Sequence, residues 1–241
     1  MQLQKDKPIS RAKSTAPQLS DPGRFLRKLL GQATWEAERG FPPRSGGARA
    51  PLIQKGQWMK TIILGITGSI AAYKAPDIVS RLIKNHIDTH VVMTKNGASF
   101  ITPLTMQTMS RNRVYVDVLQ EDDPKEVIHV NLPQRADLIL IAPATANIIA
   151  KLAHGIADDM LTSMVLAAHD IPKLIAPAMN TRMYENEATQ HNLNILEQRG
   201  WEVIEPRTAM LACGYEGKGA LADVNVIVQS TINSIGSGLK T

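Results

Sequence analysis

Short apolar runs alternate with amphipathic segments along most of this chain. Each run is short and most are rich in Val, Ile and Leu, the pattern of strands that are covered on both faces. Five such runs predict strands, at residues 61–66, 89–94, 138–142, 173–176 and 201–205. Between them apolar residues recur at helical spacing, as at Ile78, Val79, Leu82 and Ile83. This alternation predicts an α/β fold, a doubly wound three-layer sandwich with a parallel sheet.

The first 58 residues differ in composition from the rest of the chain. They are rich in Pro, Gly, Ser and Arg, and they carry 11 basic and 4 acidic residues, a net charge of +7. We expect a disordered basic extension at 1–58, one domain at 59–235 and a flexible tail at 236–241. Two interpretations of the extension stay open. It is either part of a transit peptide, with a short basic helix near residues 25–30, or an upstream extension ahead of a true start at Met59.

The charge, the apolar runs and the cysteine and histidine content of the domain exclude several classes of partner. Residues 59–241 hold 16 basic and 18 acidic residues, so this part is nearly neutral and no nucleic-acid partner is expected. No apolar run reaches the roughly 18 to 20 residues that span a bilayer, so we expect no membrane association. The single cysteine, Cys213, cannot form an internal disulfide and fits a reducing compartment, the cytoplasm. The six histidines lack metal-ligand spacing, and Asp158 and Asp159 are typical of a helix start or of a pair that neighbours a bound cofactor, so no metal is expected.

Unusual sequences follow the predicted strands at the points where the strands end. Residues 65–70 read GITGSI, residues 143–147 read PATAN and residues 177–180 read PAMN. In parallel α/β sheets ligands gather at the carboxyl ends of the strands. Gly68 permits a tight turn and Ser69 can cap a helix, so this loop suits the phosphate of a mononucleotide. The loop lacks the full G-x-G-x-x-G spacing, and a Gly-Ser turn also occurs for structural reasons alone.

Three further side chains have both a chemical and a structural interpretation. Asn147 and Asn180 end two matched segments, where each can bind a ligand or bond its local backbone as a turn residue. Cys213 lies in a Gly-rich stretch, residues 211–219, in which a thiol is poorly placed to fill a core. We therefore predict a chemical role for this thiol, with a small buried hydrophobe as the alternative.

Together these motifs resemble the homo-oligomeric flavin-containing cysteine decarboxylase family, from Met59 to about Ile232. Residues 143–148 are similar to its P-x-S-A-N-T flavin motif, residues 177–184 to its P-x-M-N-x-x-M-W motif, and residues 211–219 to its substrate clamp. His129 matches the family's active-site histidine. The chain departs from these motifs at three positions, which are Ile148 for Thr, Tyr184 for Trp and Tyr215 for Asp. None of these changes removes a group that the family's chemistry requires.

The resemblance implies a flavodoxin-like or Rossmann-like flavoprotein that holds FMN. The implied FMN contacts are Thr67, Gly68, Ser69, Ile70, Thr94, Thr145, Ala146, Asn147 and Ala178. His129 would be the base and positioning group, although a structural histidine at a helix start is the alternative. Asn180 would bond the substrate carboxylate, and Met210 and Ala212 would contact the substrate. Cys213 would be the proton donor, carried on a flap whose glycines 214, 217 and 219 allow closure.

The implied reaction is the decarboxylation of 4'-phosphopantothenoylcysteine to 4'-phosphopantetheine in coenzyme A biosynthesis. FMN takes hydride from the carbon that bears sulfur, and the resulting thioaldehyde accepts the electrons released as carbon dioxide departs. The ene-thiol that remains is then protonated and reduced.

Further expectations concern assembly and the competing functions. The resemblance implies a homotrimer or a dodecamer of trimers, with flavin sites between subunits. The chain stops where bifunctional bacterial versions continue into a ligase, so we expect a monofunctional decarboxylase. The competing functions are a flavin prenyltransferase, a peptidyl-cysteine decarboxylase and a noncatalytic regulatory flavoprotein. The presence of His129, Asn180 and Cys213 argues against these three.

Overall fold

The computed structural model describes residues 60–120, 126–210, 214 and 216–237. The predicted extension at 1–58 lies outside the described residues, as do Ala212, Cys213 and Tyr215. None of the helices in the described part of the chain has the length and apolar content that crossing a membrane requires.

A parallel sheet of six strands forms the centre of the described domain, in the order β3-β2-β1-β4-β5-β6. The strands are β1 (Lys60–Ile66), β2 (Ile87–Met93), β3 (Val114–Tyr115), β4 (Leu138–Ala144), β5 (Lys173–Pro177) and β6 (Trp201–Val203). The first strand, β1, lies in the middle of the sheet. Strands β2 and β3 follow on one side of it, and β4, β5 and β6 follow on the other side. This order confirms the predicted doubly wound fold and places its topological switch point between β1 and β4.

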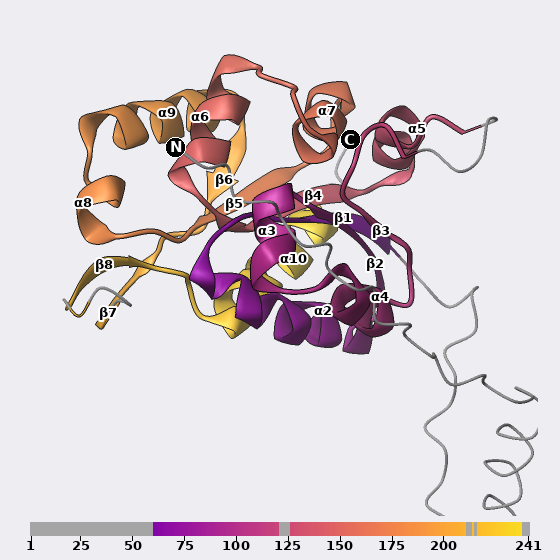
Figure 1. Cartoon of the computed structure of the whole chain (residues 1–241), viewed down its shortest axis with the longest axis horizontal. Helices are drawn as coiled ribbons and strands as arrows, with labels where there is room; N and C mark the ends of the chain where they lie inside the picture. The colour runs from indigo at the N-terminus through magenta and orange to yellow at the C-terminus, as the bar shows by residue number, and fades with distance from the viewer. Residues whose placement is uncertain (1–59, 121–125, 211–213, 215, 238–241) are drawn as a thin grey trace, which may run out of the picture. The chain divides into compact units, whose positions relative to one another are not determined.

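Helices cover both faces of this sheet (Figure 1). Apolar residues of α2, α4 and α10 pack on one face, and those of α5, α6, α7 and α9 pack on the other. The helices are η1 (Ile70–Lys74, a 3₁₀ helix), α2 (Ala75–Lys84), α3 (Lys95–Phe100), α4 (Pro103–Ser110), α5 (Ile128–Arg135), α6 (Ala146–His154), α7 (Met160–Ala167), α8 (Thr181–Tyr184), α9 (Glu187–Gln198) and α10 (Val224–Ser237). Helix α10 extends two residues past the predicted domain end at 235.

The alternation of side chains along β1 explains why the strands are apolar throughout. Ile62 and Leu64 lie in the core under α2 and α10, whereas Ile63 between them lies in the core under α6 and α7. All three side chains are fully buried. Since both faces of the sheet are covered, the strands carry continuous apolar runs, and this is the pattern from which they were predicted.

A two-stranded antiparallel hairpin, β7 (Arg207–Met210) and β8 (Glu216–Ala220), follows the last strand of the sheet. The sequence predicted a glycine flap here, and the structure shows that the flap's arms are strands. Gly217 packs so closely on α8 that an added Cβ would lie 2.3 Å from Thr181 Oγ1. Gly219 has φ +146, and an added Cβ would lie 2.4 Å from the carbonyl oxygen of Met179. These two glycines therefore let the hairpin lie against the start of α8.

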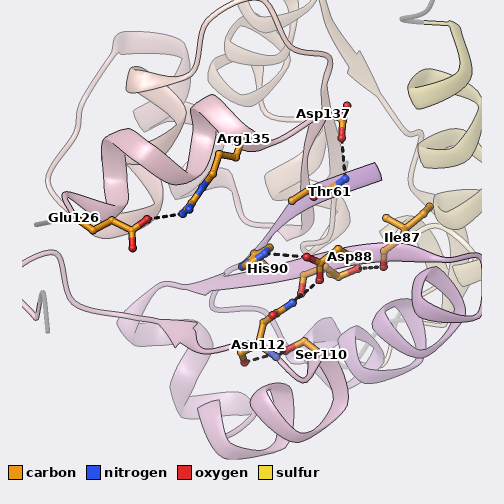
Figure 2. A network of polar contacts seen from close by, with 10 residues as sticks. Thr61, Ile87, Asp88, His90, Ser110, Asn112, Glu126, Arg135 and Asp137 are labelled. Atoms are coloured by element: carbon orange, nitrogen blue, oxygen red, sulfur yellow. Dashed lines mark hydrogen bonds and ion pairs between the residues drawn. The ribbon is translucent and has the colours of Figure 1, made fainter. Parts of the chain in front are cut away.

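Polar contacts tie the strands together in their amino-terminal half (Figure 2). The Thr61 amide donates to Asp137 Oδ2 at 2.8 Å, which joins the start of β1 to the residue before β4. Asn112 Nδ2 donates to Asp88 Oδ1 at 2.7 Å, and His90 Nε2 lies 3.3 Å from Asp88 Oδ2. These contacts hold β2 against the segment before β3. This polar network is therefore structural. It lies toward the end of the sheet where the strands begin, opposite the loops that follow the strands.

Candidate functional site

A pocket of about 470 Å³ lies at the carboxyl ends of β1, β4 and β5. This is a typical volume for a small-molecule site. The lining residues come from the loop and helix after β1, from the loops after β4 and β5, and from the β7–β8 hairpin. They are Gly68, Ser69, Ile70, Ala71, Tyr73, Lys74, Thr145, Ala146, Ala178, Met179, Asn180, Met183, Arg207, Met210, Gly219, Ala220 and Leu221. The pocket therefore sits at the topological switch point, where doubly wound folds bind ligands.

Six of the nine predicted cofactor contacts line this pocket. They are Gly68, Ser69, Ile70, Thr145, Ala146 and Ala178. The other three, Thr67, Thr94 and Asn147, do not belong to its lining. The loops of residues 68–71, 145–146 and 178 present mostly glycine and alanine, so their backbone can approach a ligand closely. Small side chains of this kind, beside the Ser69 and Thr145 hydroxyls, fit a planar ring with a polar chain.

Thr67, which follows β1, is bonded to the segment that holds Pro143 and Thr145 at the end of β4. Its side chain is buried, and its Oγ1 donates to the Pro143 carbonyl at 2.7 Å. The same oxygen accepts from the Thr145 amide at 3.1 Å. Thr67 therefore positions the loop that carries Thr145, in place of the direct pocket contact that the resemblance implied.

Hydroxyl side chains cap the helices that start at the pocket. Ser69 Oγ accepts from the Ala71 amide at 3.3 Å at the start of η1, and Thr145 Oγ1 accepts from the Ile148 amide at 3.3 Å at the start of α6. Away from the lining, Thr94 caps α3 through the Gly97 amide at 3.0 Å. These caps fix where each helix begins, and so they fix the shape of the loops that line the pocket.

The matched segments end differently in the structure. Asn147 is exposed in the first turn of α6 and lies outside the pocket lining. Asn180 lines the pocket and also caps α8, because its Oδ1 accepts from the Arg182 amide at 2.9 Å. Asn180 therefore has the structural role of a helix cap and also lies at the pocket, and its binding of a ligand stays a prediction. With its oxygen held by the backbone, the amide nitrogen is the group of this side chain that can donate to an acidic ligand.

His129 does not lie in the lining of the pocket. It is the second residue of α5 and is half-buried. Helix α5 packs on α7, whereas the pocket is built from η1, the starts of α6 and α8, and the hairpin. One copy of the described chain thus does not bring His129 into this pocket with Asn180.

The hairpin forms the outer wall of the pocket. Met210, at the end of β7, lines the pocket and is 70% exposed. Two predicted residues between the arms, Ala212 and Cys213, lie outside the described residues. Gly219 accepts from the Met179 amide at 2.9 Å, so the hairpin is bonded to the loop that carries Asn180.

Tyr184, the residue that replaces the family's Trp, helps to hold this hairpin. Its hydroxyl donates to Glu205 Oε2 at 3.2 Å, and Glu205 forms an ion pair with Lys218 of β8. The Lys218 ammonium lies 5.4 Å from the centre of the Tyr184 ring. Burial, and then the negative charge of Glu205, raise the pKa of Tyr184. The substitution therefore keeps a buried ring beneath the hairpin and adds a polar contact to it.

Two basic residues of the pocket were missed at the sequence level. Lys74 is the last residue of η1 and Arg207 is the first of β7, and both line the pocket. Burial lowers the pKa of Lys74, and the nearby charge of Arg207 lowers it further. The two are 133 positions apart, and only the docking of the hairpin beside η1 brings them together. No motif in the sequence could have paired them.

The described residues include no group of three or more His, Cys, Asp or Glu side chains that could hold a metal ion. Asp159 is the N-cap of α7, and its Oδ1 accepts from the Thr162 amide at 2.9 Å. This confirms the helix-start interpretation of the Asp158–Asp159 pair.

Comparison with known proteins identifies the family. The model of the flavoprotein family matches residues 54–236. The chain belongs to the flavoprotein family. A probable phosphopantothenoylcysteine decarboxylase of Streptococcus mutans is 50% identical to this flavoprotein over 171 residues, which cover 70% of this chain and 96% of the relative. The resemblance to the flavin-containing cysteine decarboxylases is thereby confirmed.

Longer relatives and solved structures agree with this placement. The coenzyme A biosynthesis bifunctional protein CoaBC of Bacillus subtilis is 46% identical over 170 residues, and the match spans 42% of its length. The FMN-dependent cysteine decarboxylase SpaF matches this flavoprotein with a TM-score of 0.66 and 31% identity, covering 76% of this chain and 98% of SpaF. A PPC decarboxylase mutant complexed with pantothenoylaminoethenethiol matches with a TM-score of 0.65 and 29% identity, covering 72% and 97%.

Proposed function

We propose that this flavoprotein catalyses the FMN-dependent decarboxylation of 4'-phosphopantothenoylcysteine to 4'-phosphopantetheine, a step of coenzyme A biosynthesis. The observation that carries the proposal is the pocket at the switch point, where the Gly68–Ser69 loop and Asn180 line one cavity. The 50% identity to a probable phosphopantothenoylcysteine decarboxylase supports the choice of substrate, and the FMN dependence of SpaF supports the choice of flavin.

In this proposal the pocket holds FMN against the small residues after β1, β4 and β5. Gly68, Ser69, Ile70, Thr145, Ala146 and Ala178 would contact it, while Thr67 and Thr94 shape the loops. When bound, FMN supplies reversible hydride transfer with the carbon next to sulfur, so that the cysteinyl thiol can become a thioaldehyde. The thiocarbonyl accepts the electron pair released as carbon dioxide leaves, which turns an unactivated carboxylate into one that can depart.

The roles of the protein side chains follow from what each can donate. Asn180 would hold the substrate carboxylate through its amide nitrogen, without the full countercharge that would stabilise the reactant. Cys213 would protonate the ene-thiol as it is reduced, and in the sequence it follows Met210, which lines the pocket, by three positions. His129 would take the thiol proton. These roles are carried over from the resemblance, and each is open to test.

Because the pocket of one chain lacks His129, we propose that a second copy supplies it, within a homotrimer or a larger assembly of trimers. Two strongly impaired variants test this directly, Asn180→Asp and His129→Asn, when they are mixed during refolding or coexpressed. Sites shared between subunits predict that the mixture regains activity, because some interfaces then pair an intact His129 with an intact Asn180. Sites confined to one subunit predict no gain over the separate variants.

The reaction itself is tested with the purified full chain, 4'-phosphopantothenoylcysteine and no added reductant. We expect release of carbon dioxide and formation of 4'-phosphopantetheine. The Cys213→Ser variant should still release carbon dioxide and leave a product about two mass units lighter, because the final reduction fails. Normal product from this variant would remove Cys213 from the mechanism. A peptide that ends in cysteine, supplied in parallel, measures the competing peptidyl-cysteine activity.

The proposal includes two further predictions, one on the range of activities and one on the location in the cell. We predict that the chain has the decarboxylase activity alone, so that adding cysteine, nucleotide and 4'-phosphopantothenate should give no condensation product. We also predict a cytoplasmic location, which fractionation of cells that express the full chain would test.

A further inference from the structure

Both charged residues that line the pocket are positive. These are Lys74 and Arg207, and no Asp or Glu is among the lining residues that the structure describes. Within the described residues, neither side chain takes part in an ion pair. Arg207 Nε donates to the Leu221 carbonyl at 3.2 Å, which anchors the guanidinium at the hairpin. Two cations that share a cavity without a carboxylate repel each other, and an anion that binds between them relieves this repulsion.

The position of the pair separates it from the loop after β1. Helix η1 runs from Ile70 to Lys74, and a 3₁₀ helix rises about 2 Å per residue, so Lys74 lies roughly 10 Å beyond Ser69 along the chain. Arg207 comes from the hairpin and not from a loop at the end of a sheet strand. The pocket therefore offers a second polar region, at a distance from the Gly68–Ser69 loop and beside the proposed substrate clamp.

The electrostatics of Lys74 agree with this arrangement. Burial and the Arg207 charge lower its pKa, whereas the more weakly felt Asp223 carboxylate raises it. Lys74 is half-buried and Arg207 is exposed, so the Lys74 ammonium is partly desolvated. The Arg207 guanidinium is anchored through Nε, and its Nη1 and Nη2 groups can donate to a ligand. Arginine and lysine together are the usual recognition set for a phosphate dianion.

We propose that Lys74 and Arg207 bind the 4'-phosphate of the substrate and so select phosphorylated over unphosphorylated pantothenoyl compounds. This proposal rests on the proposed function, because it assigns a part of that substrate to a part of the same pocket. It makes the pair a specificity determinant. The reacting cysteinyl end would be held at Asn180, and the phosphate at the pair would anchor the opposite end of the molecule.

The test compares two ligands that differ only in the phosphate. Binding of 4'-phosphopantetheine and of pantetheine to the flavin-loaded full chain is measured by calorimetry. The wild type should bind the phosphorylated compound about 10- to 100-fold more tightly, the effect of charge-assisted hydrogen bonds. Lys74→Gln and Arg207→Gln should each remove most of this preference and leave pantetheine affinity unchanged. Arg207→Lys should retain part of it, because it keeps the charge but not the planar fork.

Lys84→Gln is the matched control, because it removes one positive charge from an exposed position of α2 outside the pocket. It should keep the wild-type preference. The visible flavin absorbance of every variant is recorded as well, and loss of flavin from Lys74→Gln or Arg207→Gln would assign the pair to the cofactor and overturn the proposal. If Lys74→Gln does not fold, the exposed Arg207→Gln variant decides alone.

The two proposals fail in different ways in this experiment. If the wild type releases carbon dioxide from 4'-phosphopantothenoylcysteine but both variants keep the phosphate preference, the role of the pair is wrong and the function stands. If the wild type prefers the phosphorylated ligand, the variants lose that preference and no carbon dioxide is released, the function is wrong and the phosphate site stands. Equal binding of both ligands by the wild type refutes the phosphate site.

Discussion

Replacing Asn180 by Asp separates its structural role from its proposed chemical role. Asn180 caps α8 with its Oδ1, 2.9 Å from the Arg182 amide. Asp is as good an N-cap as Asn, so the cap should persist and the free energy of unfolding should change by less than about 0.5 kcal/mol. The same substitution removes the donor nitrogen from the pocket and puts a second carboxylate beside that of the substrate.

The size of the catalytic effect follows from the charge. Two carboxylates about 4 Å apart repel by roughly 4 kcal/mol at an effective dielectric constant of about 20, which corresponds to about a 10³-fold loss of kcat/KM. Asn180→Ala should show the opposite division. It loses the cap, at about 1 kcal/mol of stability, but brings in no charge, so its activity should fall by only about 10- to 100-fold.

The chain provides a matched control for this change. Asn186 caps α9 in the same way, with its Oδ1 3.0 Å from the Ala188 amide, and it lies outside the pocket lining. Asn186→Asp should therefore leave both stability and kcat/KM near wild type. The assay is carbon dioxide release, paired with chemical unfolding of each variant. An Asn180→Asp enzyme that keeps kcat/KM within about tenfold of wild type would refute the assigned contact with the substrate carboxylate.

Three further predictions concern the framework of the pocket. Thr67→Val should lower the free energy of unfolding by about 1–3 kcal/mol, because it leaves the buried Pro143 carbonyl without its donor and loosens the loop after β4. Thr67→Ser keeps the hydroxyl and should have a small effect when both variants are compared by thermal unfolding. Gly217→Ala should cost about 1–3 kcal/mol through overpacking on Thr181, and a double-mutant cycle with Thr181→Ala should recover part of it; additive losses would show that the two residues do not touch. Because burial raises the pKa of Tyr184, its phenol proton is bound more tightly in the folded state, so this stabilisation is present below pH about 10 and is lost as pH rises through the raised pKa. Tyr184→Phe should reduce the decrease in unfolding free energy that the wild type shows as pH rises above about 10. Identical pH profiles for the wild type and the variant would contradict this prediction.

The sheet was largely predictable because its physical cause is local. Strands buried on both faces need continuous apolar runs, and residues 61–66 and 138–142 carry that pattern within the observed β1 and β4. The two-residue β3 carries no such signal, because an edge strand so short is defined by its pairing with Val91 and Val92 and not by its own composition. The glycines of residues 216–220 suggested a loop, yet there they allow close packing of a hairpin arm on α8.

The site was predictable where motifs follow strand ends and not where distant segments meet. Ser69, Thr145 and Asn180 each follow a strand, so the fold class alone brings them to one edge of the sheet. Lys74 and Arg207 meet because the hairpin docks beside η1, which depends on tertiary packing that no local pattern records. The placement of Thr67 beneath the pocket has the same origin, since its partner Pro143 is 76 positions away.

The central claim is that a bound flavin takes two electrons from a thiol substrate and returns them within one turnover. The most direct measurement is an anaerobic reaction of the purified full chain with 4'-phosphopantothenoylcysteine and no other reductant, followed by carbon dioxide yield, product mass and visible absorbance. The account predicts one carbon dioxide for each substrate, 4'-phosphopantetheine as product and the same oxidised flavin spectrum before and after. Carbon dioxide release by a colourless protein, or a flavin-loaded protein that leaves this substrate intact, would contradict it.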